Sequence, residues 1–312
     1  MKLEKKIIIF TIIAIGIYSV FLALTDVNLV YDKFSNFKFE YIPLIMIIIF
    51  SSWFVLFLRW VLVLKNYHIE IPFKDNLLIF FTGYAFAISP GKSGELIKSV
   101  LLKEKFGIKR SITVPLVVAE RFYDIVGALI VSFFGMIFLG FDFLPIVIGA
   151  ATILSLAYVL IYSQSVFNSI LKIVSKISFL NKFIEPFKDS RIILKKSTKG
   201  NMAIFSILLT VVYRLIESVG VLLVLLAFDI DILHYLALTA IYATSIILGN
   251  VSLIPGGVGI TEGSLTGLFS LQGIELSIAI VLSISIRFFT LWYAVIVGFI
   301  SMKLSRTVNL NE

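Results

Sequence analysis

The chain has 312 residues, of which 59% are hydrophobic and 15% are charged, and its formal net charge at pH 7 is +8. Soluble domains carry about a quarter charged residues, so this composition and a mean hydropathy of +1.05 exclude an ordinary soluble protein and indicate a membrane protein. The absence of cysteine excludes disulfides, thiol catalysis and thiolate metal sites.

Apolar runs long enough to cross a bilayer recur along the chain. A helix needs roughly 18 or more apolar residues to cross about 30 Å of hydrocarbon, and its backbone polar groups must be satisfied within the segment. Six full spans are predicted, at residues 7–24, 42–64, 115–139, 144–162, 202–227 and 277–302. We interpret the first as a membrane helix, because its apolar run is too long for a typical signal peptide.

Two weaker apolar stretches, 76–89 and 235–249, each lead into a break rich in proline and glycine. The breaks read SPGKSGE from Ser89 and PGGVG from Pro255, and the short segments 94–106 and 261–273 follow them. Short helices paired around a break favour re-entrant hairpins over spans. We therefore expect an all-α membrane protein with about six transmembrane helices and two re-entrant broken-helix hairpins, forming a single membrane domain over residues 1–312.

The basic residues predict how the helices are oriented. Three lysines precede the first span, the loop 163–201 contains many more, and Lys303 and Arg306 follow the last span. Because cytoplasmic loops carry an excess of lysine and arginine, both termini and this loop are predicted to be cytoplasmic. The cell (plasma) membrane is the expected location. The net positive charge is then explained by basic residues in cytoplasmic loops, which face anionic lipid headgroups. A nucleic-acid partner is not needed to explain it.

The two break regions resemble each other. Residues 107–112 match residues 273–278, and the same offset places Arg121 on Arg287. The charge-derived orientation makes the span after the first break run outward and the span after the second run inward. This predicts inverted repeats, about 42–139 and 202–302, a plan that recurs in transporters whose binding site lies where the repeats meet.

Charged residues inside the apolar spans are the sharpest functional signal, because each costs about 2.5–3.5 kcal/mol at the centre of a membrane helix. Arg214 and Glu217 are three residues apart and could neutralise each other. Arg287 has no acid within reach on its own helix, so it is expected to find Glu262, Glu217, another buried group or an anionic ligand. Arg59, in contrast, is interpreted together with Arg110 as a snorkelling or topology residue.

Arginine and broken helices both suit an anionic ligand. Guanidinium groups match phosphate oxygens, and a broken helix offers free backbone N–H groups at a positive dipole end. Lys92 would add positive charge at the cytoplasmic mouth of the first break. The predicted substrate-binding residues are Lys92, Glu95, Glu120, Arg121, Asp124, Arg214, Glu217, Pro255, Gly256, Gly257, Glu262 and Arg287.

At these motifs the sequence resembles the transmembrane flippase region of lysylphosphatidylglycerol synthases and its stand-alone relatives. The matching residues are PGKSGEL from Pro90, ERFYD from Glu120, PGGVGITE from Pro255, and Arg287, within a resemblance over roughly 40–300. It implies translocation of a lipid with a charged or phosphate headgroup, either aminoacylated phosphatidylglycerol or a polyprenyl-phosphate-linked sugar. The family's soluble synthase domain is not in this sequence, so aminoacyl transfer is not expected. Lys92 departs from the residue that members often have.

We therefore expect a lipid flippase or scramblase that needs no cofactor or metal and has no catalytic residue. Its partners would be membrane lipids with anionic headgroups. The sequence does not determine the oligomeric state, and a homodimer is one alternative. The main alternative is a secondary transporter of a small organic anion, for which a closed cavity is expected. A lipid-modifying enzyme would need a nucleophile or metal constellation that the sequence does not offer, and a scaffold gives no reason to keep Arg287 in lipid.

Overall fold

The computed structural model describes residues 35–89, 94–139, 144–174 and 184–305, together with Gly16, Thr25, Tyr31 and Lys33. Every regular element within these ranges is helical, which confirms the all-α class. The predicted first span, 7–24, lies outside the described residues apart from Gly16.

Four of the described helices are long and apolar enough to cross a membrane. They coincide with four of the six predicted spans, and a fifth predicted span, 144–162, forms the 19-residue helix α7 (Leu144–Tyr162). The four are α3 (Tyr41–Asn66), α6 (Arg110–Gly135) with a 3₁₀ turn at Met136–Phe138, α10 (Asn201–Ala227), and the rod of α13 (Leu276–Arg287), a π-helical segment (Phe288–Trp292) and α14 (Tyr293–Leu304).

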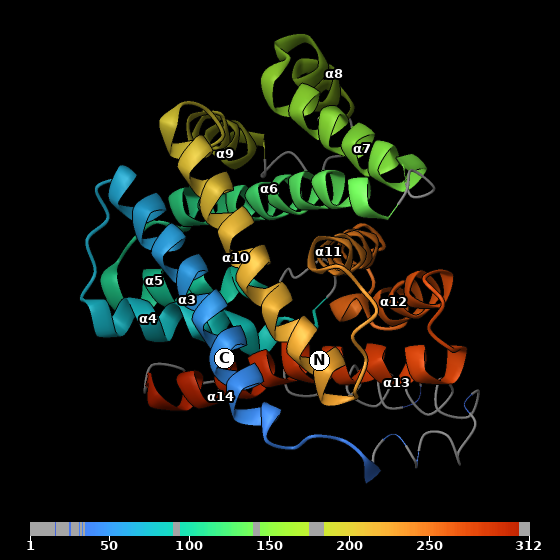
Figure 1. The fold of residues 1–312 in the computed structure, drawn as a ribbon. Helices are drawn as coiled ribbons and strands as arrows, with labels where there is room; N and C mark the ends of the chain where they lie inside the picture. Colours follow the sequence, from blue (N-terminus) through green and yellow to red (C-terminus); the bar gives the residue numbers. More distant parts are fainter. Residues whose placement is uncertain are drawn as a thin grey trace.

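Each proline- and glycine-rich break separates two short helices, as predicted. The first break lies between α4 (Phe73–Thr82), which a 3₁₀ turn extends to Phe86, and α5 (Ile97–Phe106). The second lies between α11 (Tyr235–Val251) and α12 (Ile260–Leu271). The two pairs occupy opposite sides of the view in Figure 1. Their re-entrant course in the bilayer and the inverted repeat stay predictions.

The basic loop 163–201 contains two helices, α8 (Gln164–Val174) and α9 (Ile184–Ser197). Arg191 on α9 lies 4.2 Å from the ring centroid of Phe167 on α8 and donates a 2.6 Å hydrogen bond to Gln164. The described parts of this loop are therefore two helices that pack against each other, which was not predicted from the sequence.

The centre of the fold is the crossing of α3, α6 and α10. Figure 1 shows α10 running beside α3 and crossing in front of α6, and α10 packs against both of these helices. A Cβ at Gly127 of α6 would lie 2.6 Å from Cγ2 of Thr210 on α10, so only glycine permits this approach. Thr210 accepts a 2.6 Å hydrogen bond from Arg59 on α3. The same crossing therefore positions buried charged side chains.

Candidate functional site

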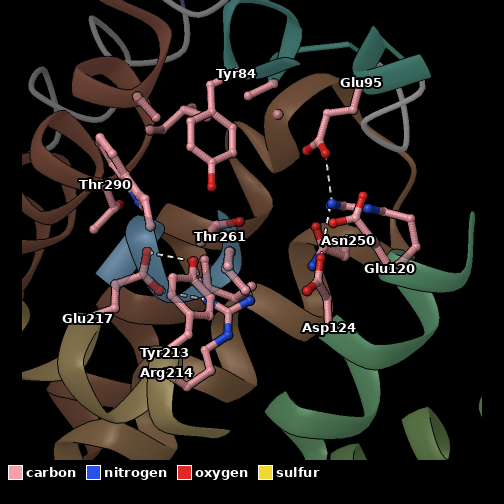
Figure 2. Close-up of a pocket in the computed structure, with 18 of the residues that line it drawn as sticks. Tyr84, Glu95, Glu120, Asp124, Tyr213, Arg214, Glu217, Asn250, Thr261 and Thr290 are labelled. Atoms are coloured by element: carbon pink, nitrogen blue, oxygen red, sulfur yellow. Dashed lines mark hydrogen bonds and ion pairs between the residues drawn. The ribbon is translucent and has the colours of Figure 1, made fainter. Parts of the chain in front are cut away.

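A cavity of about 70 Å³ lies among α3, α6, α10, α11, the α13–α14 rod, and both breaks with the short helices beside them. This volume holds several water molecules. Figure 2 shows side chains from these elements converging on it. Among the described residues, its charged lining comprises four arginines and four carboxylates: Arg59, Arg121, Arg214, Arg287, Glu95, Glu120, Asp124 and Glu217.

The first half of the site is a network of ion pairs around α6. Arg121 binds Glu95 of the first break at 2.7 Å and Asp124, one turn along its own helix, at 3.1 Å. Arg59 reaches across from α3 to Asp124 at 2.6 Å and to Glu120 at 3.5 Å. The three carboxylates thus hold the two guanidinium groups in fixed positions.

The interpretation of Arg59 as a snorkelling or topology residue is wrong. Its side chain is 1% exposed and its partners lie on another helix. The charge of Arg59 was visible inside the apolar run 42–64, but its acids are more than 60 residues away, where sequence spacing gives no information. Arg110 is exposed, as expected of a topology residue.

Sequence reasoning also missed Lys98. Its ammonium lies 2.5 Å from Glu120 and 3.7 Å from Glu95, and its side chain is buried. The same nitrogen lies 4.5 Å from the ring centroid of Trp60, a cation–π contact. With Lys98, the network around α6 contains three cations and three carboxylates, so its charges are balanced. In the sequence, Lys98 resembled the surface lysines around it.

The second half of the site begins with Arg214 and Glu217 on α10. Arg214 donates to Oε2 of Glu217 at 2.8 Å, and the hydroxyl of Tyr213 donates to Oε1 at 2.8 Å. Both charged side chains are 3% exposed. The predicted neutralisation within one helix is confirmed.

Arg287 finds Glu262, one of its predicted partners. Its Nε donates to Oε1 of Glu262 at 2.8 Å, and a terminal nitrogen donates to the carbonyl of Gly256 at 2.5 Å. The other oxygen of Glu262 accepts from the backbone N–H of Gly259 at 2.7 Å, half of a capping box at the start of α12. Gly256, Gly257 and Gly259 have φ values of 63°, 64° and 88°, in the left-handed region that favours glycine.

The π-helical segment follows Arg287 directly, and two of its residues, Thr290 and Leu291, line the cavity. Such segments often occur at functional sites, because they widen the helix locally and redirect side chains.

The structure brings most of the predicted residues together. Eight of them line the cavity: Glu95, Glu120, Arg121, Asp124, Arg214, Glu217, Gly256 and Arg287. Glu262 contacts Arg287 without being in the lining, and Pro255 and Gly257 shape the loop that presents Gly256. Lys92 lies outside the described residues.

Comparison with known proteins identifies the family to which the chain belongs. A family model described as the lysylphosphatidylglycerol synthase TM region matches residues 9–298. The chain belongs to this family. A UPF0104 membrane protein, MJ1595 of Methanocaldococcus jannaschii, is 23% identical over 283 residues, which cover 84% of each chain. No solved structure matches.

This member of the lysylphosphatidylglycerol synthase TM-region family is a multi-pass membrane protein, as its long apolar helices and its relative both indicate. The side of the membrane on which its termini lie stays a prediction. The family's matched region contains the whole described cavity, because every lining residue falls between 53 and 294.

Proposed function

We propose that this protein is a flippase or scramblase that moves a lipid with an anionic or phosphate headgroup between leaflets. One observation carries the proposal. Three of the four arginines around the cavity, Arg59, Arg121 and Arg214, have a buried Nε–H that finds no acceptor in the described part of the chain. An unsatisfied buried donor costs about 1–3 kcal/mol, and phosphate oxygens are the acceptors that guanidinium groups bind best.

The balance of charge explains how such a site is stable without a ligand. Each arginine is held by a carboxylate, so the empty cavity carries no net charge into the membrane, where uncompensated charge is expensive. An arriving phosphate would compete with these carboxylates for the guanidinium groups. The carboxylates are the groups that could take up protons if transport is coupled to a proton gradient.

Arg121 is where a headgroup would enter. Its side chain is 26% exposed, whereas the other charged lining side chains in ion pairs are at most 8% exposed. From Arg121 a phosphate could pass inward to Arg214 and Arg287. A cavity of about 70 Å³ has no room for acyl or prenyl chains, so the tails would stay in the bilayer.

The alternative, a secondary transporter of a small organic anion, is favoured by one observation. The cavity is small and most of its charges are buried, which also suits a small soluble cargo. Both candidates use the same arginines, so only the nature of the cargo distinguishes them.

Reconstitution into liposomes tests the choice. Fluorescent phosphatidylglycerol and a fluorescent polyprenyl phosphate would be followed by leaflet-selective quenching, and uptake of labelled organic anions would be measured in parallel vesicles. We expect at least one lipid to cross faster than in empty vesicles and the soluble anions not to enter. Uptake of a soluble anion with no lipid movement would replace the flippase by the alternative.

A further inference from the structure

Tyr84 lies in the 3₁₀ turn Gly83–Phe86 that leads into the first break. Its ring makes edge-on contacts with Trp53, Phe80 and Phe81, at centroid distances of 5.5, 5.4 and 5.7 Å. A phenylalanine ring would make the same contacts. Packing therefore accounts for the ring but not for the hydroxyl.

The hydroxyl of Tyr84 is buried and has no hydrogen-bond partner in the described part of the chain, although the residue lines the cavity. Figure 2 shows it pointing into the cavity, with Glu95 and Glu217 on either side in this view. Other buried tyrosine hydroxyls do have partners: Tyr213 donates to Glu217 and Tyr123 to the carbonyl of Ser197. The hydroxyl of Tyr84 is therefore available to donate a hydrogen bond to a ligand in the cavity.

We propose that the Tyr84 hydroxyl donates a hydrogen bond to a phosphate oxygen of the transported headgroup, which makes Tyr84 a headgroup-binding residue. The proposal rests on the proposed function. Its position suits the role, because Tyr84 lines the same cavity as Arg121, which would bind the same phosphate.

A hydroxyl can donate a hydrogen bond to a phosphate without adding charge to the cavity, whereas a further cation would add charge. The charged lining is already balanced, and another arginine would leave an uncompensated charge in the membrane whenever the cavity is empty. A neutral donor strengthens phosphate binding without that cost, since a hydrogen bond to a charged group is stronger than one between neutral groups.

The test is Tyr84→Phe, with Tyr293→Phe as its matched control. Tyr293 contacts the same Trp53 ring, at 4.9 Å between centroids, but is not among the cavity-lining residues. Translocation would be measured in liposomes as a function of the content of the phosphate lipid that the wild-type protein moves. Binding would be measured separately, as the rise in melting temperature caused by dihexanoyl phosphatidylglycerol or geranyl phosphate.

We expect Tyr84→Phe to fold with an unchanged or higher melting temperature without ligand, and to need roughly tenfold or more lipid for half-maximal translocation. Its ligand-induced rise in melting temperature should shrink, whereas Tyr293→Phe should match the wild type in both measurements. The proposal is overturned if Tyr84→Phe keeps the wild-type half-saturation and ligand-induced rise, whether or not its maximal rate falls. A wild-type protein that moves no lipid would instead overturn the proposed function.

Discussion

Glu262 binds Arg287 through one carboxylate oxygen at 2.8 Å and the backbone of Gly259 through the other at 2.7 Å. One side chain thus fixes both an intramembrane cation and the break beside it. In the first half of the chain, Glu95 of the first break likewise binds an arginine of a long helix, Arg121, at 2.7 Å. Both breaks are therefore tied to an arginine on the long helix that follows them.

Variants of Arg287 can distinguish its contribution to folding stability from its contribution to lipid transport. Arg287→Gln leaves Glu262 buried without its cation, so it should cost about 3–5 kcal/mol of folding free energy. The double variant Arg287→Gln with Glu262→Gln should recover much of that stability, because no buried charge is left unpaired. Thermal unfolding in detergent measures both.

Lipid translocation by the double variant should stay at least about tenfold slower than wild type, since the headgroup has lost a cationic partner. A double variant that is stable and transports at the wild-type rate would remove Arg287 from the lipid path.

Arg59 is predicted to stabilise the fold strongly, although its own helix contains no acidic residue. Arg59→Met leaves Glu120 and Asp124 with weaker compensation, and we expect a loss of about 3–5 kcal/mol in unfolding free energy. The control is Arg110→Met, at an exposed arginine, which should change stability by less than about 0.5 kcal/mol. Equal melting temperatures for the two variants would show that Arg59 is not a buried partner of α6.

The first break depends on Gly94. A Cβ there would lie 2.4 Å from Cβ of Phe86 and 2.8 Å from its carbonyl oxygen, so Gly94→Ala should destabilise the fold by about 1–3 kcal/mol through overpacking. Gly149→Ala is the matched control, because nothing lies within 4 Å of its added Cβ in α7. There, alanine should be neutral or stabilising. Melting curves that rank the two variants in the opposite order would contradict the close approach at the first break.

An exposed ion pair joins the start of α3 to the end of α10. Lys38 lies 2.9 Å from Asp229 and lowers the pKa of that carboxyl below its usual value. The pair's contribution to stability is therefore present above the ordinary carboxyl pKa and lost as pH falls through the lowered one. We expect the melting temperature of wild type to fall slightly more steeply than that of Asp229→Asn below about pH 4, and this difference to vanish in high salt. A difference that persists in high salt would indicate another cause.

Contacts within one helix or around one break could be predicted from the sequence, but contacts between distant helices could not. The pair Arg214 and Glu217 follows from helical spacing, and Glu262 could be named among the possible partners of Arg287 because the helix of Arg287 has no acid within reach. Arg59 and Lys98 required the crossing of α3 with α6 and the fold of the first break, which no local pattern encodes. Tyr84 was missed because an aromatic residue in an apolar run resembles packing until its hydroxyl is seen without a partner.

On the function proposed above, a phosphate headgroup crosses the membrane by binding the arginines of the cavity. The most direct measurement is the rate at which labelled phosphate lipid leaves the inner leaflet of proteoliposomes, compared between wild type and Arg214→Lys. Lysine keeps the charge beside Glu217 but removes the unpaired Nε–H. We predict wild-type translocation well above that of empty vesicles and a fall of about tenfold or more in Arg214→Lys, because the guanidinium fork is lost. Equal rates for the two folded proteins would show that the guanidinium group of Arg214 does not bind the headgroup.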